Sequence, residues 1–215
     1  MSRDLLVRTL VASVVAVAVL EFVPRVPWLW ALIAAAVAAL LVPGVIRWRR
    51  SWLEARRKGA AAAAALREKV LTRQFLLRAP PAAPDRVRCA VMDWSVGSGV
   101  ATLVAFDDGS TSLYLIPGGG IIGAGAHENV AQAATAFRQE AATLLDRFSP
   151  VETFPLPPRK RVVFYLVTSA ATLSSGELET RVLRRATHPY AALERKAQAV
   201  ITAIRRVSMR ANAAA

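Results

Sequence analysis

A glycine tract at residues 117–129, PGGGIIGAGAHEN, has the residue types and spacing closest to a binding motif. Within it Gly118, Gly120 and Gly123 satisfy G-x-G-x-x-G. A helix that begins after such a loop offers free amides and a partial positive charge to a phosphate group. The candidate ligand-binding residues are therefore Gly118, Gly120, Gly123, Gly125, His127 and Glu128.

The same glycines also have a structural interpretation, which we favour. In dinucleotide-binding folds the motif belongs to the first βαβ unit of a parallel sheet, whereas here it follows two predicted hairpins. No basic side chain lies inside loop 118–125, and the carboxylate of Glu128 would repel a phosphate. Glycines that supply positive φ, bulges or close backbone packing would produce the same pattern.

Acid–base or nucleophilic chemistry needs a carboxylate, an imidazole and a hydroxyl. These types are present in Asp93, His127, Glu128, Ser95 and Ser98. Nothing in their spacing brings them together, and H-E-x-x-H is absent because Ala131 stands four residues after His127. We interpret Asp93 as the polar side of a strand, predict no catalytic residue and favour a protein that is not an enzyme.

Metal and disulfide sites are not indicated by the sequence. Cys89 is the single cysteine, which excludes an intramolecular disulfide and a zinc site built on several cysteines. His127 and His188 are too far apart in sequence to suggest a metal site by themselves. We expect neither a metal nor a cofactor.

Two apolar runs precede these residues and predict a transmembrane helical hairpin. Residues 26–46 carry no charge and, as a helix, would span roughly 30 Å, the thickness of a bilayer core. Residues 5–23 form a weaker run that contains Arg8 and Glu21, for which a secretory signal peptide is the alternative.

The net charge of +13 is concentrated just after the second run, where residues 47–78 hold ten basic and two acidic residues. Such a segment is attracted to anionic lipid at about 1 kcal/mol per basic residue, so nucleic acid is not needed to explain it. This asymmetry predicts an inner-membrane protein with both termini in the cytoplasm. The residues expected at the membrane surface are Arg47, Arg49, Arg50, Arg56, Arg57 and Lys58.

Proline and glycine positions divide the chain. We predict a hairpin (1–46), a basic juxtamembrane helix (47–78), a proline-rich linker (79–84), a cytoplasmic domain (85–210) and a disordered tail (211–215). Leucine, valine and phenylalanine side chains of the 47–78 helix form a stripe suited to a membrane surface or a partner helix. The alternative is that this stripe packs on the domain.

The cytoplasmic domain is predicted to be an α+β fold. Apolar alternation and turn residues predict strands at 87–95, 99–106, 110–116 and 161–167, and helices at 128–148 and 187–207. Residues 174–185 are either a short helix or a strand. The resulting order β-β-β-α-β-α gives an antiparallel sheet covered by helices, with strand 161–167 central.

Two functions from different classes remain. The favoured hypothesis is a membrane-anchored interaction or regulatory module that binds a protein partner, or a second copy of itself, near an anionic bilayer. The alternative is a small-molecule or phosphate-binding domain, with or without enzymatic activity, that uses loop 118–125 with His127 and Glu128.

Overall fold

The computed structural model describes residues 54, 58–78, 83–116 and 119–213. The chain divides into two units, and the described residues all belong to the second, Leu53–Ala215. This unit includes the helical residues 58–71, which were assigned from the sequence to a separate stalk.

The predicted transmembrane hairpin and inner-membrane localisation have to be corrected. In the described part of the chain, no helix is long and apolar enough to cross a membrane. Helix α5 (Ala191–Ala213) has the length of a span but carries charged side chains such as Arg195 and Arg205. The predicted spans, 5–23 and 26–46, lie outside the described residues. So do Arg47, Arg49, Arg50, Arg56 and Arg57. The transmembrane fold class and the membrane localisation are therefore not supported.

A three-stranded meander forms the first part of the sheet. Strands β1 (Val87–Val96), β2 (Gly99–Phe106) and β3 (Thr111–Ile116) pair antiparallel in sequence order. Gly97 and Gly109 in the two turns have φ of 59° and 87°, values that glycine adopts without strain. These three strands confirm the strand predictions made from apolar alternation and turn residues.

The rest of the sheet adds one long strand and several short ones. They are β4 (Gly120–Ile121), β5 (Ser149–Pro150), β6 (Arg161–Thr168), β7 (Thr172–Ser174) and β8 (Leu178–Glu179). Over the described residues, the sheet has the order β4-β3-β2-β1-β6-β7-β5, with β8 paired to β6. The order predicted from the sequence lacked the four short strands.

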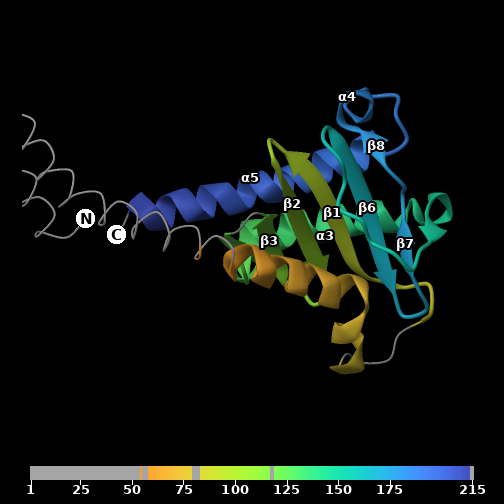
Figure 1. Ribbon diagram of the computed structural model, residues 1–215, viewed down its shortest axis with the longest axis horizontal. Helices are drawn as coiled ribbons and strands as arrows, with labels where there is room; N and C mark the ends of the chain where they lie inside the picture. The colour runs from red at the N-terminus through yellow and green to blue at the C-terminus, as the bar shows by residue number, and fades with distance from the viewer. Residues whose placement is uncertain (1–53, 55–57, 79–82, 117–118, 214–215) are drawn as a thin grey trace, which may run out of the picture. The chain divides into compact units, whose positions relative to one another are not determined.

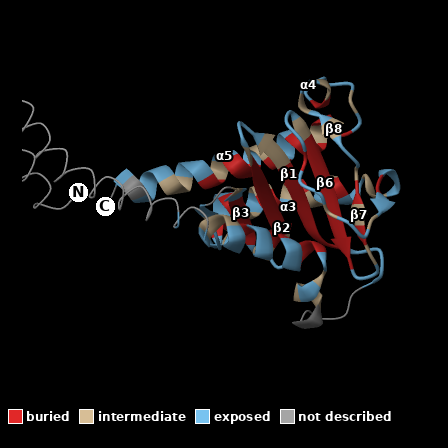
Figure 2. Cartoon of the chain, viewed as in Figure 1, coloured by how far each residue is buried: buried red, intermediate tan, exposed pale blue. Residues whose placement is uncertain are grey.

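Helices α3 (Glu128–Ala142) and α5 pack against each other and cover one face of the sheet (Figure 1). Their apolar stripes meet alternate residues of the strands in one core, in which Phe137 and Phe164 are fully buried. Figure 2 shows that the buried residues are concentrated in the strands and on the inner sides of these helices.

The opposite face of the sheet is covered by the helix of residues 58–71. Its alanine-rich sequence favours a helix, and Ala63, Val70 and Leu71 are buried in a second core with Val91 and Val104. The structure thus shows the packing on the domain that was left open as an alternative. Beyond it, η1 (Gln74–Arg78) leads toward β1.

Several predicted boundaries shift. Helix α3 ends at Ala142, before the short 3-10 helix η3 (Leu145–Arg147), and α5 continues through Ala213 into the predicted tail. The ambiguous segment 174–185 contains strand β8 and then helix α4 (Thr180–Leu183).

We predict that the helix of residues 58–71 is required for the stability of the domain. A chain that begins at Asp85 should unfold at a lower denaturant concentration than one that begins at Leu53, because it exposes the apolar side chains of the second core and loses the ion pair between Arg67 and Asp93. Urea unfolding followed by circular dichroism measures this. Equal midpoints for the two chains would show that the helix contributes nothing.

Candidate functional site

The described part of the glycine tract is held by close backbone packing. Gly120 lies in β4 with φ 143°, and a Cβ there would clash with the carbonyl oxygen of Leu113. A Cβ at Gly125 would likewise clash with the carbonyl oxygen of Gly109. Gly123 has φ 74° and precedes the 3-10 helix η2 (Ala124–Ala126). Gly118 lies outside the described residues. Each described glycine therefore has a structural reason to be glycine.

His127 and Glu128 lie at the start of α3 and are exposed. The His127 side chain makes no capping hydrogen bond to the helix, and Glu128 Oε1 accepts a bond of 3.0 Å from Gln132 Nε2. The Asp93 carboxylate lies on the opposite face of the sheet from His127 and Glu128. It faces the helix of residues 58–71, whereas α3 covers the other face. The structure does not bring these three predicted groups together.

Asp93 is not the exposed polar residue that we inferred from the sequence. It is fully buried, and its carboxylate forms an ion pair with Arg67, with 2.6 Å between Nη2 and Oδ2. Arg67 Nε donates to the same oxygen at 2.8 Å, and Thr102 Oγ1 donates to Oδ1 at 2.6 Å. Burial raises the pKa of Asp93 above its usual value, while Arg67 and Thr102 oppose that rise.

Arg67 also fixes the loop that leads to β6. Its Nη1 donates to the carbonyl oxygen of Phe154 at 2.9 Å and its Nη2 to that of Pro155 at 3.3 Å. The guanidinium carbon lies 5.9 Å from the centre of the Tyr165 ring. The Arg67 guanidinium group therefore joins the helix of residues 58–71, strand β1 and the loop before β6. Its N–H donors are occupied by these structural hydrogen bonds.

Cysteine and metal chemistry receive no support from the described residues. Cys89 is fully buried in β1, and burial raises the pKa of its thiol well above the usual value, which leaves it protonated and unreactive. Among the described residues no group of three or more histidine, cysteine, aspartate or glutamate side chains is placed to hold a metal ion.

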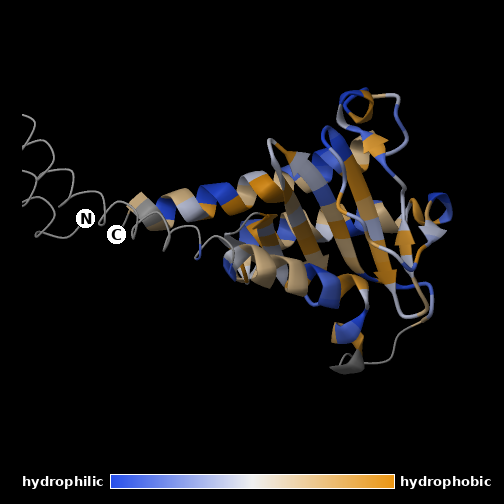
Figure 3. Ribbon diagram, viewed as in Figure 1, coloured by the Kyte–Doolittle hydropathy of each residue, from blue (hydrophilic) through white to orange (hydrophobic). Residues whose placement is uncertain are grey.

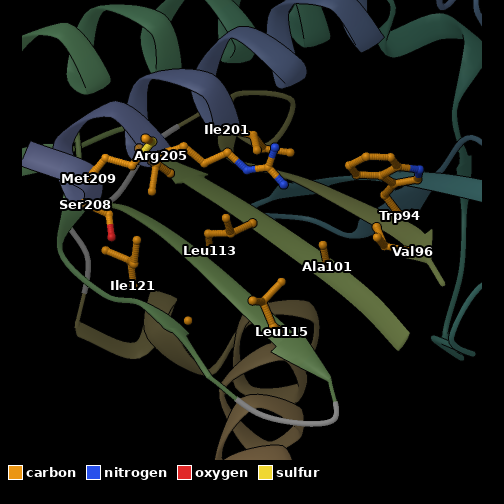
Figure 4. A pocket seen from close by; sticks show the side chains of 12 residues that line it. Trp94, Val96, Ala101, Leu113, Leu115, Ile121, Ile201, Arg205, Ser208 and Met209 are labelled. Carbon is orange, nitrogen blue, oxygen red and sulfur yellow. The ribbon is translucent and has the colours of Figure 1, made fainter. Parts of the chain in front are cut away.

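An open apolar groove lies where the last turns of α5 pass over β1, β2, β3 and β4; we call it the α5 groove (Figure 4). Its volume is about 520 Å³. The groove is lined by Trp94, Val96, Ala101, Leu113, Leu115, Gly120, Ile121, Ile201, Ile204, Arg205, Ser208 and Met209. Of the candidate residues named from the sequence, Gly120 is the one in this lining.

Three large apolar side chains at this groove are open to solvent. Val96, Leu115 and Met209 are 43%, 42% and 72% exposed. Figure 3 shows that the strands beneath are strongly apolar, whereas α5 alternates between apolar and polar residues toward its C-terminal end. Such a cluster of exposed apolar side chains beside a hollow is typical of a binding surface.

A second, smaller pocket shares Trp94 with the α5 groove. It has a volume of about 200 Å³ and is lined otherwise by Ser95, Gly97, Arg159, Lys160 and Thr180. We call it the basic pocket. Ser95 is the residue of this lining that was named from the sequence, as a candidate hydroxyl group, and no local sequence pattern places Arg159 and Lys160 beside Trp94.

We predict that Asp93→Ala lowers the free energy of unfolding by about 3–5 kcal/mol, because it leaves the Arg67 guanidinium buried without its counter-ion. The double variant Arg67→Met/Asp93→Leu should recover more than half of this loss. Arg86→Ala is the matched control: Arg86 is exposed, and Asp107 keeps its second ion pair with Arg88, so the cost should stay below about 1 kcal/mol. Urea unfolding measures all three, and equal costs for Asp93→Ala and Arg86→Ala would contradict the prediction.

Tyr165 gives a prediction at alkaline pH. Burial raises its pKa to about 12, above the unfolded value of about 10, with a further rise from Asp93 and an opposing effect of Arg67. The folded state therefore keeps the phenol proton longer, so this contribution to stability is present below about pH 10 and lost as the pH rises toward about 12. Wild type should lose stability relative to Tyr165→Phe over that range in urea unfolding. A difference in the free energy of unfolding between wild type and Tyr165→Phe that stays constant over this pH range would contradict the prediction.

Comparison with known proteins identifies no relative: no family model, no curated protein and no solved structure matches this chain. Function has to be inferred from the groove and pocket themselves.

Proposed function

We propose that the domain is a binding module and that the α5 groove holds the apolar chain of a small ligand. The observation that supports this is the open groove of about 520 Å³, a size typical of ligand sites, with Val96, Leu115 and Met209 exposed along it. Burying such side chains under a ligand is favourable by about 25 cal/mol for each Å² of apolar surface removed from water.

The polar groups in the groove support binding more than catalysis. Among the described residues that line the groove, Arg205 and Ser208 carry the polar side chains, and none carries a carboxylate or an imidazole that could act as a general base. His127 and Glu128, the residues of the alternative function predicted from the sequence, belong to neither the α5 groove nor the basic pocket. The protein partner or second copy of the chain expected from the sequence stays a prediction.

Decanol, a neutral single-chain alcohol, tests the proposal. We expect saturable binding to the full chain, followed through the indole N–H signal of Trp94, which is assigned by its loss in Trp94→Phe. Ser208→Phe should fill the groove and weaken binding at least about tenfold, because the ligand loses about two buried methylene groups.

Arg210→Phe is the matched control, since Arg210 is exposed on α5 and does not line the groove. Both variants should keep the wild-type circular dichroism spectrum. If decanol leaves the Trp94 signal unchanged, or if Arg210→Phe weakens binding as much as Ser208→Phe, the groove is not the binding site.

A further inference from the structure

The charge in the α5 groove is positive and directional. Among the described residues of the lining, Arg205 is the charged one and none carries a carboxylate. Figure 4 shows its side chain extending from α5 along the groove toward Trp94, while Met209 lies at the opposite end. The groove is therefore apolar along its length and cationic toward one end.

The basic pocket adds two more cations at that end. Trp94 lines both hollows, so the basic pocket with Arg159 and Lys160 adjoins the groove at the end toward which Arg205 extends. The described lining of the basic pocket contains no acidic side chain either, and it includes the hydroxyl groups of Ser95 and Thr180.

The loop that carries these cations is held in place by hydrogen bonds. Lys160 has φ 64°, a strained value for a residue with a side chain, and its carbonyl oxygen accepts bonds from Thr180 N at 3.0 Å and Thr180 Oγ1 at 2.9 Å. The next residue, Arg161, donates its backbone N–H to Ser95 Oγ at 3.0 Å. These bonds fix the basic tip beside the end of β1.

We propose that the ligand is a single-chain amphiphile with a small anionic head, a long-chain carboxylate. Its head lies at the Trp94 end among Arg205, Arg159 and Lys160, and its chain runs along the α5 groove toward Met209. This inference rests on the proposed function and adds the head group and the direction of the ligand.

The chemistry of the two hollows selects this class. A guanidinium group binds a carboxylate through two parallel, charge-assisted hydrogen bonds, which a neutral alcohol cannot form. A cationic head group is disfavoured, because it would meet three positive side chains and no carboxylate among the described residues of either lining. The volumes of about 520 and 200 Å³ suit one chain and a small head.

Three decyl compounds with the same chain test the head group on the full-length protein. Decanoate, decanol and decylammonium are titrated at neutral pH, and the Trp94 indole signal reports occupancy of the groove. We expect decanoate to bind at least about fivefold more tightly than decanol, as for a partly exposed charge pair, and decylammonium to bind more weakly than decanol.

Matched variants on α5 and in the loop assign the effect. Arg205→Gln and Arg159→Gln should each weaken decanoate binding about three- to fivefold, and each should weaken decanoate binding more than decanol binding. Arg206 is exposed next to Arg205 but does not line the groove. Arg206→Gln should therefore change the affinities for decanoate and decanol by less than twofold.

The outcomes separate the two proposals. Two results would contradict the anionic head group but not the groove as a ligand site. One is equal affinity for decanoate and decanol, and the other is loss of decanoate binding in Arg206→Gln but not in Arg205→Gln. Absence of binding for all three compounds overturns both proposals. If an acidic amphipathic peptide shifts the Trp94 signal and no decyl compound does, the occupant is a protein segment and the carboxylate proposal is wrong.

Discussion

The ion pair between Arg67 and Asp93 is the constraint on which the domain depends. A carboxylate buried without a partner would cost several kcal/mol, so the fold has to bring a cation to this point of β1. Arg67 supplies that charge from the helix of residues 58–71, and its remaining donors bind the carbonyl groups of Phe154 and Pro155. The pair thus fixes the helix, the strand and the loop relative to one another.

The same pair also holds the frame of the candidate site on the other face of the sheet. Trp94 follows Asp93 in β1, so their side chains point to opposite faces, and Trp94 lines both the α5 groove and the basic pocket. Pro155 lies in the loop that continues to Arg159 and Lys160. Closing one face of the sheet therefore positions the aromatic wall of the groove on the other face, and it fixes the loop that leads to the two cations.

Local patterns in the sequence are sufficient for the long strands but not for this ion pair. Alternation and turn glycines are local signals. By contrast, β5 and β8 are defined by pairing with strands that are distant in sequence, and β4 and β7 are too short, at two and three residues, for alternation to show. Asp93 was taken for a solvent-facing residue because a carboxylate in an alternating strand normally is one. The overlooked signal is Arg67 itself, which shares one helical stripe with Ala63, Val70 and Leu71.

The α5 groove could not be predicted because five elements build it and none of them has a motif. It stays open because α5 continues beyond the strands: Ile201 is buried, whereas Met209, about two turns later, is exposed. Ala101 and Gly120 add little volume to the opposite wall. Gly120 cannot be enlarged, since a Cβ would meet the carbonyl oxygen of Leu113. The glycine that resembled part of a phosphate loop is therefore required by close packing against the backbone of β3, and it contributes backbone atoms to the wall of the groove.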